Sequence, residues 1–202
     1  MDAHAVNPKT KIVDTGAGNR ISLPENYRGA IKINLTASNC VIEIGASPKL
    51  GLNIVMAGDG SVLKVGENTT FGDIRLFMHE AGSVTIGRDC MFSGDIWLSN
   101  SDLHSIVDAD TGERFNWPED VVIGDHVWIG RGVTVTKGSR IGDGAIIGAR
   151  SVVTGEIEPY SLAVGVPARV IRSNVTWDRK RLEPGQRSRH RRGGRGGGGS
   201  DE

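Results

Sequence analysis

The stretch VVIGDHVWIGRGVTVTKGSRIGDGAIIGARSVVTG, residues 121–155, carries a large aliphatic residue at every sixth position. The members of this series are Ile123, Ile129, Val135, Ile141, Ile147 and Val153. A period of six fits neither the 3.6-residue turn of an α-helix nor the alternation of an ordinary strand. It fits a three-sided coil, in which each hexad forms a short flat strand and a corner, and three hexads close a turn of about 18 residues. The stretch therefore predicts an all-β protein, a parallel β-helix with a column of Ile and Val inside.

Upstream of this stretch the same period persists, with slips of three residues that we interpret as irregular corners. The shorter series are Ile44, Leu50, Met56 and Val62, then Val65, Phe71 and Phe77, and finally Ile86, Phe92, Leu98 and His104. A chain of 202 residues has room for one such domain. We expect a flexible N-terminus over residues 1–11, the β-helix over residues 12–178 and a disordered Arg- and Gly-rich tail over residues 179–202.

One interruption stands out in this repeat. His104 and Ile123 are 19 positions apart, which is one hexad and 13 additional residues. The segment 105–120 is rich in Asp, Asn, Gly and Pro, which favour turns and loops. It therefore predicts a loop extruded from one corner, and such insertions commonly carry the binding surface of a solenoid.

The zero net charge of the chain hides a division between its two parts. From Arg179 onward there are 8 Lys or Arg against 3 Asp or Glu, a charge of +5, so residues 1–178 carry −5. A mildly acidic body excludes a nucleic-acid surface, which needs clustered cations on a folded face. The basic tail is either solvated or makes weak contacts with an anionic surface.

Other features point to an intracellular protein without a disulfide framework. No apolar segment is long enough to cross a bilayer and none follows Met1 as a signal segment would, so we expect a cytoplasmic location. The two cysteines, Cys40 and Cys90, are far apart and are expected to be buried thiols.

Three segments make the chain resemble a known family: SNSDLHSI at 99–106, VVIGDHVWIG at 121–130 and AVGVPARVIR at 163–172. They resemble the hexapeptide-repeat acyltransferases, over about residues 40–178, and within them the O-acetyltransferases of bacterial capsule, lipopolysaccharide and sialic acid sugars. The likeness to galactoside and maltose acetyltransferases is more distant. The resemblance implies a left-handed coil, a homotrimer with a groove between subunits, and transfer of acetyl from acetyl-CoA to a carbohydrate hydroxyl.

The resemblance also implies roles for residues near the loop. His104 matches the general base, and an imidazole suits this task because it can accept the proton of a sugar hydroxyl near neutral pH. Asp102 and Asn100 are candidates to orient that imidazole or to bind the acceptor, although a plain turn role stays open for both. Trp128 matches an aromatic beside the acceptor and pantetheine groove, and His79 is a weaker candidate for the same groove.

For acetyl-CoA, the resemblance assigns a set of residues toward the C-terminal end of the coil. They are Gly148, Ala149, Ser151 and Thr154 along the pantetheine arm, and Arg169 and Arg172 near the phosphates. Gly155 stands where many relatives have Lys after the Thr, so one phosphate contact is missing. We expect no metal, and we interpret His126 as a solvated corner residue and His4 and His190 as parts of the chain ends.

Three alternatives remain at this stage. One is an N-acetyltransferase of an amino-sugar nucleotide, whose relatives usually carry a nucleotide-binding domain before the coil. Another is a γ-type carbonic anhydrase, which needs three converging His; His79, His104 and His126 are numerous enough, but the closely spaced pair of that class is absent. The third is a non-catalytic β-solenoid scaffold.

Overall fold

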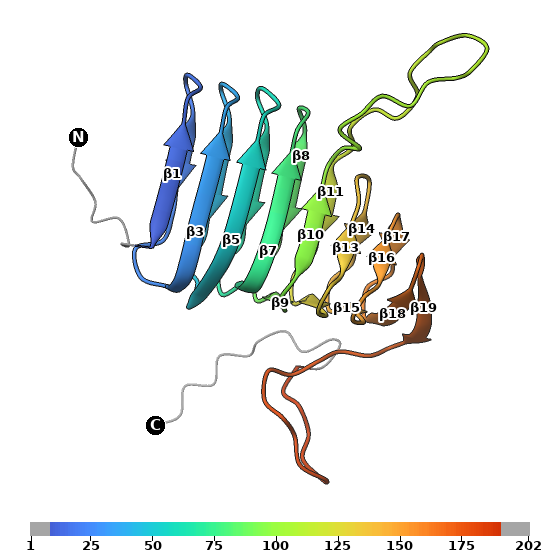
Figure 1. Cartoon of the computed structure of the whole chain (residues 1–202). Helices are drawn as coiled ribbons and strands as arrows, with labels where there is room; N and C mark the ends of the chain where they lie inside the picture. The colour runs from blue at the N-terminus through green and yellow to red at the C-terminus, as the bar shows by residue number, and fades with distance from the viewer. Residues whose placement is uncertain (1–8, 191–202) are drawn as a thin grey trace.

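The computed structural model describes residues 9–190, which form one coil of stacked parallel strands, a protruding loop and a C-terminal segment outside the coil (Figure 1). We call one complete turn of this coil a rung. The first ladder of strands contains β2 (Arg20–Ser22), β4 (Val41–Ile44), β6 (Val62–Val65), β8 (Ser83–Ile86), β11 (Val121–Ile123), β14 (Arg140–Ile141) and β17 (Glu156–Ile157). Among the described residues, no helix is long and apolar enough to cross a membrane.

The remaining strands begin as one ladder and divide into two. The undivided part consists of β1 (Thr10–Asp14), β3 (Arg28–Leu35), β5 (Lys49–Met56) and β7 (Thr70–Met78). The beginning of β7 pairs with β9 (Met91–Phe92), which continues into β12 (Trp128–Ile129), β15 (Ile146–Ile147) and β18 (Ser161–Gly165). The rest of β7 pairs with β10 (Ile96–Ser99), followed by β13 (Thr134–Val135) and β16 (Val152–Val153). The last strand, β19 (Ala168–Ser173), turns back antiparallel to β18.

The length of the rung changes along the coil. Ile33 pairs with Ile54, 21 positions further on, and Ile54 pairs with Leu76, 22 positions further on. After the loop the spacing is 18, as between Val135 and Val153, and it falls to 16 in the last rung, where Ile141 pairs with Ile157. The slips of three residues therefore lengthen the early rungs, which have long strands, and are not the irregular corners that the sequence suggested.

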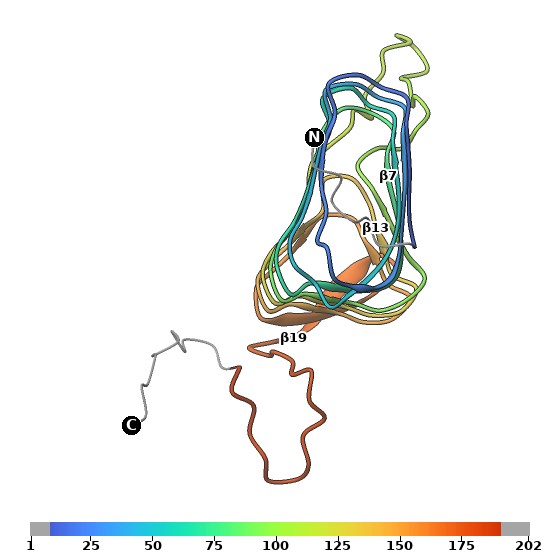
Figure 2. The same ribbon diagram turned by 90° about the vertical axis from the view of Figure 1, so that its left-hand side faces the viewer.

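Figure 2 views the coil from its N-terminal end. The long strands, which point upward in Figure 1, lie on the right-hand side of Figure 2, so the chain turns anticlockwise as it recedes from the viewer. The coil is therefore left-handed, as the resemblance implied. Figure 2 also shows that the early rungs are tall and narrow, whereas the later ones are shorter and triangular.

The interior is built from stacked side chains, several from each rung, and one of its columns is aliphatic throughout. Parallel pairing in register places these residues directly over one another, each at most 2% exposed: Ile33, Ile54, Leu76, Leu98, Val135 and Val153. Burial of each such side chain stabilises the fold by about 1.5–3 kcal/mol. The predicted buried thiols are confirmed, since Cys40 and Cys90 are both buried and free. Burial raises the pKa of Cys90 to about 11, so this thiol stays protonated.

Polar residues form one corner of successive rungs. Asn68, Asp89 and His126 occupy it with φ of 58°, 52° and 55°. The amide of Asp89 donates to the carbonyl of Glu67, and the amide of His126 donates to the carbonyl of Arg88. Asn, Asp and His tolerate this left-handed backbone better than other residues with side chains do. The corner explains why a His stands at position 126.

The inward column provides a stability prediction. Leu76→Ala should lower the free energy of unfolding by about 2–5 kcal/mol, because it opens a cavity between Ile54 and Leu98. The adjacent Arg75 is exposed, so Arg75→Ala should change stability by less than about 0.5 kcal/mol. Urea unfolding at one fixed protein concentration measures both, and equal losses would contradict this assignment of faces.

Candidate functional site

The predicted extruded loop is present and protrudes from the upper edge of the coil in Figure 1. It leaves after β10 at Ser99 and returns at Val121, so it begins several residues before the predicted boundary at 105. An antiparallel bridge between Val107 and Arg114 makes its outer part a hairpin. Such a long segment needs contacts of its own to hold a shape, and these lie at its base.

An ion pair ties the returning arm of the loop to the coil. The Arg114 guanidinium contacts the Glu80 carboxylate with both nitrogens, Nη1 to Oε1 at 2.7 Å and Nη2 to Oε2 at 2.8 Å. The two side chains are only 18% and 23% exposed. Hydrogen bonding from Arg114 lowers the pKa of Glu80, so the pair stays charged well below neutral pH. A bidentate pair also fixes the direction of the loop.

Asn116 joins both arms of the loop. Its buried amide Nδ2 donates to Asp102 Oδ2 at 2.9 Å and to the carbonyl oxygen of His104 at 2.8 Å. Its Oδ1 accepts from the Ile106 amide at 2.7 Å and from Arg114 Nε at 3.1 Å. All four hydrogen-bonding positions of this side chain are therefore used. The result is a fixed backbone on both sides of His104.

The Asp102 carboxylate is held by a lysine of the next rung. Lys137 Nζ lies 2.6 Å from Asp102 Oδ2 and donates to the carbonyl of Trp117 at 3.1 Å. Hydrogen bonds from Lys137 and then from Asn116 lower the pKa of Asp102. Within the described part of one chain Asp102 makes no hydrogen bond to the imidazole of His104. The Asp102 carboxylate is linked to the His104 backbone through Asn116, so the predicted orienting role stays a prediction.

His104 itself projects from the loop into solvent. Its amide donates to the carbonyl of Asp102 at 2.7 Å. The preceding Leu103 has φ of 67°, a left-handed conformation that is costly for a bulky residue. Such strain persists only where the surroundings enforce it, here through Asn116 and its partners. The hydrogen bonds of Asn116 therefore hold the backbone in a conformation that exposes the His104 side chain.

The loop also exposes a set of large apolar side chains. These are Leu103, Ile106, Val107, Phe115 and Trp117, each 49% to 63% exposed. Arg114 lies over the Trp117 ring, with its Cζ 4.8 Å from the centroid. Exposed apolar side chains gathered in this way are typical of surfaces that contact another molecule.

Trp128 lies in a different part of the coil. It is on β12, between β9 and β15, at the lower edge in Figure 1, whereas the loop leaves from the upper edge. Its side chain is 38% exposed and lines a groove of about 520 Å³ together with Phe71, Met91 and Phe92. One chain therefore does not bring the loop and Trp128 together.

The two other residues predicted to bind the acceptor lie under the loop. Asn100 is fully buried; its Nδ2 donates to the Glu80 carbonyl at 2.9 Å, and its Oδ1 lacks a partner within the described chain. His79 follows β7 and is half-buried, with its ring stacked on Phe77 at 5.6 Å. Phe77 in turn meets the exposed Trp97 edge-on at 5.5 Å.

The residues predicted to contact acetyl-CoA lie on the short C-terminal rungs. Ala149, Thr154, Arg169 and Arg172 are exposed, and Gly148 is half-buried at a corner. Ser151 is buried instead, and its Oγ accepts a hydrogen bond from the Gly165 amide at 3.0 Å. Its side chain thus holds the β18–β19 hairpin.

His126 is not a free surface residue. Its Nδ1 lies 2.7 Å from Asp89 Oδ2 and its Nε2 lies 3.1 Å from the carbonyl oxygen of Trp177. Both ring nitrogens therefore contact other parts of the chain. His190 stacks on the same ring at 4.4 Å.

The described residues contain one group of three potential metal ligands within 4.8 Å of one another, namely Asp89, His126 and His190. A metal would have to displace the contacts of His126 with Asp89 and Trp177. Within the described part of one chain, His79, His104 and His126 do not form the three-His set that a carbonic anhydrase needs.

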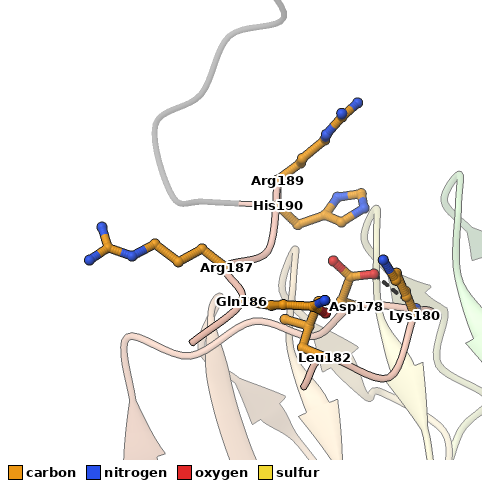
Figure 3. Close-up of a pocket in the computed structure, with 7 residues that line it drawn as sticks. All are labelled: Asp178, Lys180, Leu182, Gln186, Arg187, Arg189 and His190. Atoms are coloured by element: carbon orange, nitrogen blue, oxygen red, sulfur yellow. Dashed lines mark hydrogen bonds between the residues drawn. The ribbon is translucent and has the colours of Figure 1, made fainter. Parts of the chain in front are cut away.

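Figure 3 shows a further pocket, of about 370 Å³, built by the C-terminal segment. Its lining residues are Asp178, Lys180, Leu182, Gln186, Arg187, Arg189 and His190. The Lys180 amide donates to Asp178 at 2.9 Å, whereas Arg187 and Arg189 point away from this pair. Its lining includes no residue of the coil, so it lacks the groups that surround His104 or Trp128.

Comparison with known proteins places this geometry in a family. Residues 120–155 match the model described as bacterial transferase hexapeptide (six repeats). A polysialic acid O-acetyltransferase of Neisseria meningitidis is 32% identical over 174 residues, which cover 85% of this chain and 80% of that protein. A polysialic acid O-acetyltransferase of Escherichia coli O1:K1 / APEC is 34% identical over 125 residues, 62% of this chain but only 41% of that protein. The crystal structure of the polySia-specific acetyltransferase NeuO superposes with a TM-score of 0.75 at 28% identity, covering 88% of this chain and 93% of that one.

The chain therefore belongs to the hexapeptide-repeat acetyltransferases. Within this family it is related to the polysaccharide O-acetyltransferases.

The sequence made His104 and Asp102 candidates but did not indicate the residues that hold them. Asn116 is one of the loop-forming residues of segment 105–120, and no motif in the sequence distinguishes Glu80, Arg114 or Lys137. Glu80 and Arg114 are 34 positions apart, and no local spacing marks them as partners. The sequence offers only a weak signal, namely a Glu directly after His79 and a lone Arg in the returning arm of the loop.

Asn116→Ala should loosen the loop without unfolding the coil. It leaves the Ile106 amide and the His104 carbonyl without their partner, a loss of about 1–3 kcal/mol for each group that stays unsatisfied. Hydrogen exchange should therefore speed up over the loop and stay unchanged at β5. Arg131→Ala, an exposed Arg on the coil, serves as the control. Unaltered exchange at Ile106 in the Asn116 variant would show that this amide does not hold the loop.

Proposed function

We propose that this protein transfers an acetyl group from acetyl-CoA to a hydroxyl of a sugar or polysaccharide, with His104 as the general base. The observation that carries the proposal is the Asn116 network, which fixes the backbone on both sides of an outward-facing His at the base of an exposed loop. Membership of the acetyltransferase family supplies the reaction class. Relatives named polysialic acid O-acetyltransferases support a sialic acid polymer as the acceptor.

The proposed step needs only a base and a positioned donor. The imidazole of His104 takes the proton of the sugar hydroxyl while the hydroxyl oxygen attacks the thioester carbonyl. A tetrahedral intermediate forms; its carbon–sulfur bond then breaks, and the departing thiolate receives the proton from the imidazolium. The products are an acetyl ester and free CoA. No metal takes part in this scheme.

A second copy of the chain completes the site in this proposal. The loop and Trp128 lie at opposite edges of one coil, so a site with both requires two subunits. The apolar side chains of the loop, Phe115 and Trp117 among them, supply a surface for the neighbouring copy to cover. A closed ring of three such contacts is a homotrimer with three equivalent sites.

The remaining assignments follow the resemblance. Arg169, Arg172 and the exposed corner residues Ala149 and Thr154 lie on the rungs after the loop, where the donor is expected. His79 lies at the base of the loop, where the acceptor is expected, whereas the fully buried Asn100 supports the loop from beneath. The cations of the C-terminal segment offer a weak contact to an anionic partner. We place the reaction in the cytoplasm, where acetyl-CoA is made.

Light scattering on the purified protein should give three times the mass of the 21.5 kDa chain. Phe115→Glu combined with Trp117→Glu should shift it toward monomer and lower kcat/KM together, because the loop then has no neighbour to meet. Glu67→Gln serves as the control and should keep the assembly, because it removes a negative charge at an exposed corner of the coil instead of adding one to the loop. A fully active monomer of the wild type would contradict the shared site.

His104→Ala should lower kcat by about 10²–10⁴-fold, the usual contribution of a positioned general base, while binding of acetyl-CoA survives. Trp128→Ala should mainly raise KM, because it removes groove wall. Release of free CoA with purified sialic acid polymer, together with mass spectrometry for one added acetyl, measures both. An alkali-labile product indicates an ester, whereas a stable amide would point to the N-acetyltransferase alternative. Retention of a third or more of kcat in the Ala variant would exclude His104 as the base and make His79 the next residue to test.

A further inference from the structure

The C-terminal segment 174–190 runs back beneath the coil instead of continuing it (Figure 1). We call this segment the strap. It begins after β19 and passes the corner formed by Asp89 and His126. Most of its side chains are exposed, but Trp177 is only 5% exposed. A buried Trp in a segment without regular structure indicates a specific contact.

Trp177 is fixed to the His126 corner on three sides. Its ring stacks on the imidazole at 4.3 Å with an angle of 5° between the planes. Its Nε1 donates to the His126 carbonyl at 2.8 Å, while its own carbonyl accepts from His126 Nε2 at 3.1 Å. The reciprocal pair of hydrogen bonds and the stack leave the indole a single orientation.

Arg179 anchors the strap two residues later. Its guanidinium donates to Asp89 Oδ1 at 3.1 Å, to Thr70 Oγ1 at 3.0 Å and to the carbonyls of Asn68 and Cys90 at 3.2 and 2.9 Å. Its Cζ also lies 5.3 Å from the Trp177 ring. These four hydrogen bonds make Arg179 a tether for the strap. Arg179 also lines the groove that contains Trp128.

The fixed indole of Trp177 lies against Trp128. The two ring centroids are 6.2 Å apart at an angle of 51°, within the range of favourable aromatic pairs. Trp128 is part of a strand of two residues, and 38% of its side chain is exposed, so its own rung restrains it little. Trp177 packs against one side of the Trp128 ring, and Trp128 still lines the groove.

We propose that Trp177 is a positioning residue for the substrate groove: the strap, tethered by Arg179, holds the Trp128 indole in the orientation that forms the groove wall. This inference rests on the proposed function only in that Trp128 contacts substrate. Trp177 touches Trp128 rather than the reacting atoms, so its loss should weaken substrate binding more than the chemical step.

The experiment is a double-mutant cycle on steady-state kinetics. Trp177→Ala should raise KM about 5- to 20-fold with kcat changed less than about 3-fold, and Trp177→Phe should recover most of the loss because it restores a ring against Trp128. In the Trp128→Ala background, Trp177→Ala should add less than about a 2-fold change, since the partner through which it acts is gone. Additive effects of the two changes would overturn the proposal.

Truncations provide a matched pair. A chain that ends at Leu182 keeps Trp177 and Arg179 and should stay within about 3-fold of the wild-type KM, whereas a chain that ends at Val175 should behave like Trp177→Ala. Val13→Ala, an exposed apolar change on β1, controls for general effects. Thermal unfolding of each variant shows whether the coil is intact; a Trp177 variant that is folded but has wild-type KM would refute the positioning role.

The outcomes separate the two proposals. If Trp128→Ala leaves KM unchanged, the assignment of Trp128 to the substrate groove fails, whatever Trp177 does. If Trp128→Ala raises KM and Trp177→Ala does not, only the role of the strap fails. Arg179→Ala should reproduce part of the Trp177→Ala effect, because the tether is lost while the indole remains.

Discussion

Stacking of inward aliphatic side chains in register is the interaction on which the rest of this structure depends. Each rung places one residue of the column over its equivalent, as Ile54 lies between Ile33 and Leu76. A single rung has too little interior to be stable, so every rung relies on its neighbours. The corners and the outward faces are free to vary as long as the column is kept, and the loop, the groove and the strap are all built on these free positions.

The sequence predicted the coil well because the aliphatic residues of the column recur in it with a fixed period. The hexads from Ile123 to Val153 correspond to 18-residue rungs, as in the pairing of Val135 with Val153. The extruded loop was predictable for the same reason, since an interruption is visible against a regular pattern. Upstream the interpretation was less successful: the three-residue slips lengthen the rungs to 21 or 22 residues, a change of cross-section that hydrophobic spacing alone did not reveal.

For the candidate site too, the sequence indicates residues in local motifs but not contacts between distant parts of the chain. His104, Asp102 and Trp128 are candidates because they lie in local motifs that resemble a family. The groups that hold them were not, because their partners are distant in the chain: Arg114 reaches back 34 positions to Glu80, and Trp177 lies 51 positions from His126. Such pairs arise from the stacking of rungs and carry no local signature. His126, interpreted as a solvated corner, is in fact the docking point for Trp177.

The strap has a consequence for how the molecule unfolds. A coil whose rungs contact only their neighbours can fray from either end, one rung at a time. The hydrogen bond from Arg179 to the carbonyl of Asn68 spans 111 positions and closes the rungs between them into one loop of chain. Chain inside a closed loop gains less conformational freedom when a rung opens, so we expect these rungs to resist opening more than rungs outside the loop. The rungs before Asn68 lie outside it, and the exposed Ile12 and Val13 on β1 show how little covers that end. We therefore expect thermal fraying to begin at the N-terminal end, far from the loop that carries His104.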